Sequence, residues 1–146
     1  MHTPIVQNMI EANNYPVIAF DELDDFTSKN RFSVLFFTEL MKPVPETADV
    51  AVILPELVRA FDQRFAVAVV DWEAQRDLQR RYRFSKYPSL VFLRDGEYLG
   101  AISGVLDWAD YLADIAAILE AEPCDPPPFA FPGQAPATTL TTEQPS

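Results

Sequence analysis

Few residues of this chain are of the types that most often carry out chemistry. Its 146 residues include one cysteine, Cys124, and one histidine, His2. A zinc site needs several thiolates or imidazoles, and a Ser/His/Asp or Cys/His catalytic set needs a histidine that the fold holds in place. We expect His2 to lie in a frayed terminus and Cys124 to be an incidental free thiol. The sequence therefore predicts no catalytic residue, no metal and no cofactor.

The charge and hydropathy of the chain exclude further classes of function. The formal net charge is -11 at pH 7, and the pI is about 4.3. Such an acidic surface repels nucleic-acid phosphates and anionic membranes and favours a basic or neutral partner. The start of the chain has no cationic segment followed by an apolar run, and no apolar stretch approaches the ~20 residues that cross a bilayer. We expect a cytoplasmic protein that neither binds nucleic acid nor inserts stably into a membrane.

Composition divides the chain into a domain and a tail. Seven of the thirteen prolines lie in residues 123–146, a segment without Lys or Arg. This composition cannot form a continuous helix or a central strand. The sequence predicts one domain over residues 1–122 and a proline-rich, flexible tail over residues 123–146.

Apolar periodicity within residues 1–122 predicts alternating helices and strands. A short helix begins at Pro4 after the capping residue Thr3, with Ile5, Met9 and Ile10 on its buried face. The elements expected after it are a strand in YPVIAF, a helix in ELDDFTS, a strand over residues 32–38, a helix in VAVILPELVRAF, a strand in FAVAVVD, a helix in WEAQRDLQRRYRF, a hairpin around RDGE and a helix in WADYLADIAAILEAE. In the last helix we expect an inward stripe of Trp108, Leu112, Ile115 and Leu119.

This order resembles the thioredoxin fold over roughly residues 15–120. The most specific part is RFSKYPSLVFLRDGEYLGAISGVLDWADYL, in which Pro88 takes the place of the cis-proline of that family. The resemblance implies an α/β domain with a mixed central sheet flanked by helices, preceded here by an extra N-terminal helix. Met41 and Val44 stand where the two thioredoxin cysteines would be, and Leu35 replaces a buried aspartate that assists proton transfer. Because exchange needs a thiolate and a resolving partner, a dithiol mechanism is excluded.

A narrower resemblance includes the loop without cysteines. The stretches PVPETADVAVILPELVRAF and VAVVDWEAQRDLQRRYRFSKYPSLVFLRDGEYLGAISGVLDWADYL are similar to the HupG/HyaE hydrogenase expression/formation proteins, which are thioredoxin-like accessory factors for the uptake nickel-iron hydrogenase. The resemblance implies a non-enzymatic chaperone. Its expected partner is the hydrogenase small-subunit precursor, bound through the twin-arginine signal peptide before export. Other hydrogenase maturation proteins are further expected partners.

The thioredoxin resemblance also indicates where a peptide would bind. Thioredoxins pair an extended substrate with the backbone beside the cis-proline, and this strand addition requires no sulfur. The expected groove is lined by Leu40, Met41, Tyr87 and Pro88, and Gly104 allows the peptide to approach closely. The alternative for Leu40 and Met41 is that they only cover the core.

Acidic residues accompany the apolar floor of this expected groove. Glu39, Glu46 and Asp49 lie in or beside the loop, where each carboxylate can accept a guanidinium group of a twin-arginine signal. The denser acidic run over residues 21–25 is more typical of a solvated helix start. Two other functions stay open: a thiol-dependent oxidoreductase that uses Cys124 or a partner thiol, and a structural scaffold in the assembly complex.

Overall fold

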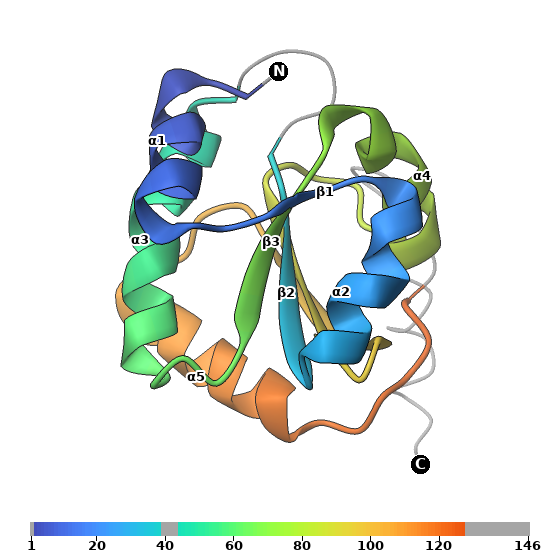
Figure 1. Cartoon of the computed structure of the whole chain (residues 1–146). Coiled ribbons are helices and arrows are strands. Elements are labelled where there is room, and N and C mark those ends of the chain that lie inside the picture. The colour runs from blue at the N-terminus through green and yellow to red at the C-terminus, as the bar shows by residue number, and fades with distance from the viewer. Residues whose placement is uncertain (1, 39–43, 128–146) are drawn as a thin grey trace.

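The computed structural model describes residues 2–38 and 44–127 of the chain, and its elements follow the predicted order (Figure 1). These elements are α1 (Pro4–Asn13), β1 (Val17–Ile18), α2 (Leu23–Lys29), β2 (Phe32–Phe37), α3 (Pro45–Ala60), β3 (Ala66–Val70), α4 (Gln75–Tyr82), β4 (Ser89–Arg94), β5 (Glu97–Ser103) and α5 (Trp108–Glu120). Short 3-10 turns, Phe20–Glu22 and Trp72–Ala74, precede α2 and α4. None of the described helices is both long and apolar enough to span a membrane.

The five strands form one mixed sheet in the order β1-β3-β2-β4-β5. β3 is parallel to both β1 and β2, whereas β4 runs antiparallel to β2 and to β5. Asp95 and Gly96 join β4 to β5 with φ angles of 52° and 83°, as the predicted hairpin turn requires. This is the α/β, thioredoxin-like sheet that the sequence predicts.

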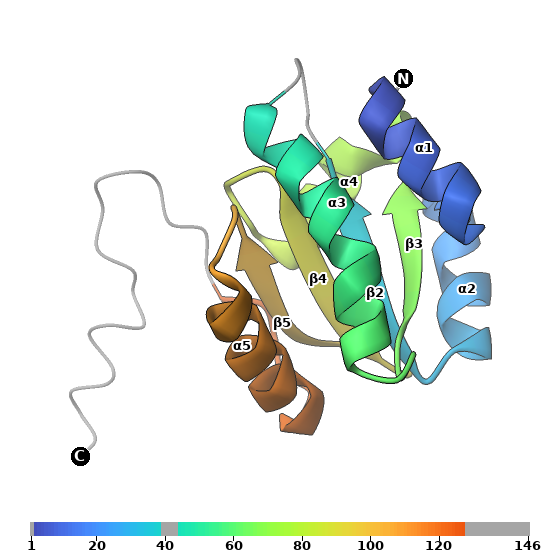
Figure 2. The same ribbon diagram turned by 90° about the vertical axis from the view of Figure 1, so that its left-hand side faces the viewer.

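Helices cover both faces of the sheet. Figures 1 and 2 show α1, α3 and α5 on one face and α2 and α4 on the other. The central strand β2 serves both layers because successive side chains alternate: Val34 and Phe36 pack under the first layer, and Leu35 and Phe37 pack under the second. All four side chains are fully buried, so β2 is held rigidly at the centre of the domain.

The added helix α1 packs against α3 through a face that differs from the prediction at one position. The Thr3 hydroxyl accepts a hydrogen bond from the Val6 N–H, which confirms the predicted cap. Val6, Met9 and Ile10 are buried, whereas Ile5 keeps 46% of its surface exposed. The expectation that Ile5 packs inward is therefore wrong, and an apolar side chain remains at the surface beside α3.

The last helix also differs from its predicted stripe at one position. Tyr111, Ile115 and Leu119 are buried and Leu112 packs against the same core, but Trp108 is 45% exposed. The Tyr111 side chain takes the inward position of the first turn, and its hydroxyl donates to the Gly104 carbonyl at 3.4 Å. The predicted inward position of Trp108 is thus wrong, because Tyr111 fills the space under the helix start.

The chain continues from α5 across the outside of the sheet. The Cys124 N–H donates to the Tyr98 carbonyl of β5 at 3.0 Å, and Arg83 donates to the Pro126 carbonyl at 3.0 Å. The predicted tail thus begins with residues that contact the domain. The rest of that tail, residues 128–146, lies outside the described residues, and its predicted flexibility stays a prediction.

Candidate functional site

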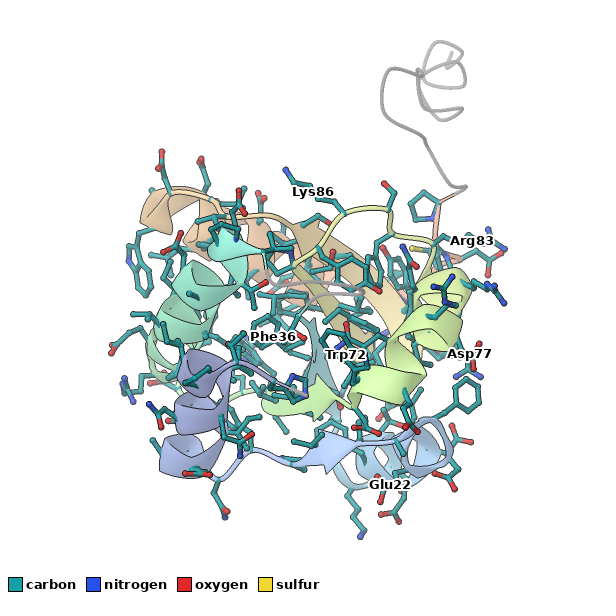
Figure 3. All side chains as sticks on the ribbon, turned by 90° about the horizontal axis from the view of Figure 1, so that it is seen from above. Glu22, Phe36, Trp72, Asp77, Arg83 and Lys86 are labelled. Carbon is teal, nitrogen blue, oxygen red and sulfur yellow. The ribbon has the colours of Figure 1, made fainter. Side chains whose placement is uncertain are left out.

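The expected groove lies at the end of the sheet where the parallel strands β1, β2 and β3 terminate. Ligands of open α/β sheets commonly bind at this carboxyl end. Thr38 follows β2 there, and Val44 and Pro45 lead into α3. Figure 3 looks onto this end of the molecule. The candidate residues Glu39, Leu40 and Met41 lie outside the described residues, so their predicted roles are untested.

The segment before β4 contains the predicted cis peptide bond, Tyr87–Pro88. Pro88 is buried, and its carbonyl accepts the Gly104 N–H at 2.8 Å, so these two candidates lie side by side. Gly104 has a φ of 77°, a value that favours glycine. A Cβ at this position would also lie 3.1 Å from Lys86 Nζ. The Lys86 ammonium group therefore lies over Gly104, which places a cation where the sequence suggested only acidic and apolar groups.

Tyr87 turns its ring toward the layer of α2 and α4. Its ring lies 5.3 Å from that of Phe84 in an edge-to-face arrangement. Burial raises the pKa of Tyr87 to about 12, and the hydroxyl has no hydrogen-bond partner among the described residues. The half-buried side chain thus packs against the core on the side of α2 and α4, and its phenol stays neutral. Its predicted contact with a peptide stays a prediction.

Asp49 lies near the same end of the molecule, on the side of α3 that faces α5. Burial raises the pKa of Tyr111, a hydrogen bond with the Leu106 backbone opposes this shift, and the negative charge of Asp49 adds to it. Asp49 is therefore near the phenol that bonds Gly104. Glu46 is one turn earlier, in the first turn of α3, and both carboxylates are exposed. The structure thus brings Asp49, Gly104, Pro88 and Tyr87 to one end of the sheet, with Glu46 at its rim.

A buried polar cluster joins Thr38, at the end of β2, to α3 and α4. Thr38 is fully buried, and its carbonyl accepts the Thr47 hydroxyl of α3 at 2.7 Å. Gln75, also fully buried, donates from Nε2 to the Thr38 hydroxyl at 3.0 Å and to the Val70 carbonyl at 3.3 Å. Thr38 therefore connects the end of β2 with the starts of α3 and α4 and fixes the frame around the groove.

His2 completes this cluster, contrary to the expectation of a frayed terminus. Its Nδ1 lies 3.5 Å from the Thr38 hydroxyl and its Nε2 is buried. Since the Thr38 hydroxyl accepts from Gln75, its single proton is available to Nδ1, which favours the neutral tautomer protonated on Nε2. Burial lowers the pKa of His2, and the nearby positive N-terminus lowers it further, while Asp71 opposes both effects.

Sequence reasoning missed four members of this frame, namely His2, Thr38, Thr47 and Gln75. Each is a polar residue beside an apolar run, and such residues are common at strand and helix ends. Except for the local Gln75–Val70 bond, their contacts join residues that are separated by 9 to 37 positions in the sequence. Only the folded chain shows that they meet.

The positions of Cys124 and Leu35 concern the alternative function as a thiol-dependent oxidoreductase. Leu35 is fully buried among apolar neighbours where thioredoxins place an aspartate. Cys124 is exposed and bonds through its N–H to Tyr98, six residues before Gly104. At about 3.3 Å per strand residue, this places Cys124 roughly 20 Å from the groove. Within the described part of the chain, no group of His, Cys, Asp and Glu is arranged to hold a metal ion.

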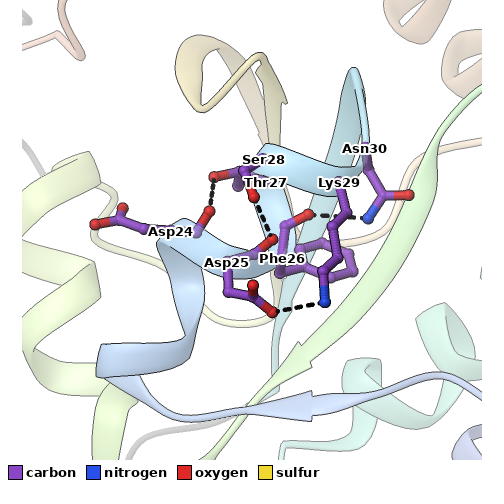
Figure 4. A network of polar contacts seen from close by, with 7 residues as sticks. All are labelled: Asp24, Asp25, Phe26, Thr27, Ser28, Lys29 and Asn30. Carbon is purple, nitrogen blue, oxygen red and sulfur yellow. Dashed lines mark hydrogen bonds and ion pairs between the residues drawn. The ribbon is translucent and has the colours of Figure 1, made fainter.

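The acidic run near α2 is engaged in local contacts (Figure 4). Asp25 forms a salt bridge with Lys29 at 3.1 Å, one helical turn away, and both side chains are about 70% exposed. The Asp24 and Asp25 carbonyls accept the hydroxyls of Thr27 and Ser28. These contacts agree with the interpretation of the run as a solvated helix start.

Comparison with known proteins identifies relatives over most of the chain. The model of the family "Hydrogenase-1 expression protein HyaE" matches residues 5–111. The hydrogenase expression/formation protein HoxO of Azotobacter vinelandii is 48% identical over 124 residues, which cover 85% of this chain and 83% of HoxO.

Solved structures agree with this assignment. A crystal structure from Rhodopseudomonas palustris CGA009, given the provisional name hydrogenase expression/formation protein HupG, is 39% identical, with a TM-score of 0.51, and the match covers 71% of this chain and 94% of that one. A mutant thioredoxin of Halobacterium salinarum NRC-1 is 27% identical, with a TM-score of 0.58, over 75% of this chain and 93% of the thioredoxin. The fold is thus thioredoxin-like, and the chain belongs to the HyaE/HoxO/HupG family of hydrogenase expression/formation proteins, which act in hydrogenase maturation.

Proposed function

We propose that this protein is a non-redox chaperone that binds the twin-arginine signal peptide of the hydrogenase small-subunit precursor in the cytoplasm, before export. The observation that carries the proposal is the contact between Pro88 and Gly104 at the end of the sheet where β1, β2 and β3 terminate. This end of the sheet keeps the cis-proline beside Gly104, while Leu35 replaces the buried aspartate of thioredoxins and residues 39–44 contain no cysteine. Such a site retains peptide binding without the chemistry of exchange.

Backbone pairing supplies the first part of the binding. Among the described residues, no hydrogen bond involves the backbone N–H or C=O of Tyr87, the residue next to the cis-proline. An extended peptide can pair with these groups as an added strand. The Lys86 side chain lies over Gly104, so a peptide backbone that approaches Gly104 has to displace this side chain. Leu40 and Met41 of the loop are the expected apolar contacts.

The charges around the groove orient the peptide. Glu46 and Asp49 lie on α3, whereas the Lys86 ammonium group lies over Gly104. The arginine pair is therefore expected along α3, away from Lys86. Each exposed charge pair contributes less than ~1 kcal/mol and is screened beyond ~8 Å at physiological salt. The acidic residues thus steer the peptide, and apolar contacts hold it.

Fluorescence anisotropy with the labelled signal peptide tests this proposal. The double variant Glu46→Lys/Asp49→Lys should weaken binding most at low ionic strength, by up to about thirtyfold for two pairs of ~1 kcal/mol each. Met41→Asp should weaken binding at every ionic strength. The matched control is Asp110→Lys/Asp114→Lys, which makes the same charge change on the exposed face of α5.

Three results separate the proposal from its alternatives. Equal binding by wild type and by all variants would place the peptide site elsewhere. No binding by wild type would favour a scaffold that contacts folded maturation proteins. Rapid reduction of insulin by the pure protein would contradict a non-redox role and favour the oxidoreductase.

A further inference from the structure

A second apolar surface lies between α1 and α3, next to the proposed peptide groove. The first turns of α1 and α3 enclose a hollow of about 420 Å³ lined by Thr3, Pro4, Ile5, Val44, Pro45, Thr47 and Ala48. Val44 and Pro45 are the residues that follow the segment 39–43, so the hollow adjoins the proposed peptide groove directly. Its walls are apolar and in part open to solvent, since Ile5 and Pro45 are exposed.

The polar side-chain atoms in this lining are already engaged. The Thr3 hydroxyl accepts the Val6 N–H, and the Thr47 hydroxyl donates to the buried Thr38 carbonyl. The other five side chains of the lining have no polar atom. A ligand therefore gains few new side-chain hydrogen bonds in the hollow, and its favourable contacts there are apolar.

The apolar surface continues along the groove between the two helices. Ile5 also lines a second hollow with Met9, Ala51 and Val52, and Val52 is 65% exposed. The lining of this second hollow also includes Pro55 and the polar residues Asn8, Asn13, Glu56 and Arg59. From Pro45 to Pro55 the apolar part of the surface extends about 15 Å along α3 at 1.5 Å per residue. The apolar region of a signal peptide has 7–15 residues, and as a helix it is ~10–22 Å long, so it fits this length.

The charges on both helices favour a cationic partner over a second copy of this acidic chain. α1 contains no Lys or Arg, and the single cation of α3, Arg59, is paired with Glu56. Glu11, Glu46 and Asp49 add negative charge along the same helices. With a net charge of -11, two copies of the chain would repel each other at this surface.

We infer that the hollow between α1 and α3 binds the apolar region of the signal peptide whose arginines lie against Glu46 and Asp49. This inference rests on the proposed function and adds a second contact region to it. The extra N-terminal helix acquires a role, because α1 supplies one wall of the hollow. The partner class is a peptide with a cationic segment followed by an apolar, helix-forming segment.

Two peptides and two substitutions test the inference in the full chain. One labelled peptide carries the arginine segment and the apolar region, and the other ends after the arginine segment. Wild type should bind the longer peptide at least tenfold more tightly. Ala48→Trp fills the hollow, and Ile5→Ser removes apolar surface from its wall. Both should reduce binding of the longer peptide at least fivefold and leave binding of the shorter one unchanged.

Ala113→Trp, on the exposed face of α5, is the matched control and should bind like wild type. Circular dichroism and light scattering show whether each variant keeps the wild-type fold and oligomeric state. Wild-type binding of both peptides with equal affinity, or unchanged binding by Ala48→Trp and Ile5→Ser, would overturn this inference and leave the proposed function intact. A change of oligomeric state in Ala48→Trp would also overturn it, by assigning the hollow to self-association. Failure of wild type to bind either peptide would overturn both.

Discussion

The hydrogen bond from the Thr47 hydroxyl to the Thr38 carbonyl offers a direct test of the frame around the groove. Thr47 is 2% exposed and Thr38 fully buried, and the oxygen atoms are 2.7 Å apart. Thr47→Val keeps the side-chain volume but leaves a buried carbonyl without this donor. The expected loss is about 1–3 kcal/mol, the cost of an unsatisfied buried polar group. This is a sizeable part of the 5–15 kcal/mol that stabilises a typical domain.

Urea unfolding followed by tryptophan fluorescence measures this loss. With a slope of about 1.5 kcal/mol per molar urea, the midpoint should fall by roughly 0.7–2 M. Thr27→Val is the matched control, because the Thr27 hydroxyl donates to the Asp24 carbonyl within α2, a local bond of small net value. Its midpoint should stay within about 0.3 M of wild type. Equal midpoints for the two variants would refute the role assigned to the Thr38 carbonyl.

Three further predictions concern the termini and the thiol. The pKa of His2 is lowered in the folded state, so its bond with Thr38 stabilises the protein above the unfolded pKa of about 6.5 and is lost as the pH falls through the folded pKa. The difference in urea midpoint between wild type and His2→Ala should therefore narrow from pH 7.5 to pH 5, and a constant difference would contradict this. Truncation after Glu122 should keep a single cooperative melt with a loss of about 1–3 kcal/mol, since it removes two exposed hydrogen bonds to the domain; loss of the cooperative transition would show that the tail completes the core. Cys124→Ser should bind the signal peptide with wild-type affinity, and a weakened affinity in the anisotropy assay would give the thiol a role.

The elements of the fold could be predicted from local patterns, but one buried position in each of two helices could not. In α1 the pairs Ile5/Met9 and Val6/Met9 both have helical spacing, so periodicity permits either buried face. Contact with α3 decides for Val6. In α5, Trp108 and Tyr111 are likewise alternatives for the inward position of the first turn. The hydrogen bond from the Tyr111 hydroxyl to the Gly104 carbonyl favours Tyr111. Such choices depend on distant residues, which a local pattern does not contain.

The candidate site could be predicted only in part, for a similar reason. Pro88 and Gly104 could be recognised from their residue types and from the strand that follows Pro88. The structure places these two residues side by side. The Lys86 ammonium group over Gly104 and the cluster around Thr38 depend on contacts between separate loops and helices. The charge pattern of the groove therefore required the folded structure.

The chain that follows α5 has a consequence for how this protein avoids self-assembly. An exposed outer strand of a sheet is a template for pairing with another molecule, and natural proteins shorten or cover such strands. β5 is an outer strand, and the Cys124 N–H occupies its Tyr98 carbonyl, while the opposite outer strand, β1, has two residues. A register shift between Phe92 and Leu93 makes the pairing of β4 with β5 irregular as well. Lateral strand exchange between copies is thus disfavoured. The proposed site at the ends of the strands remains for an extended partner, because the Tyr87 backbone makes no hydrogen bond there among the described residues.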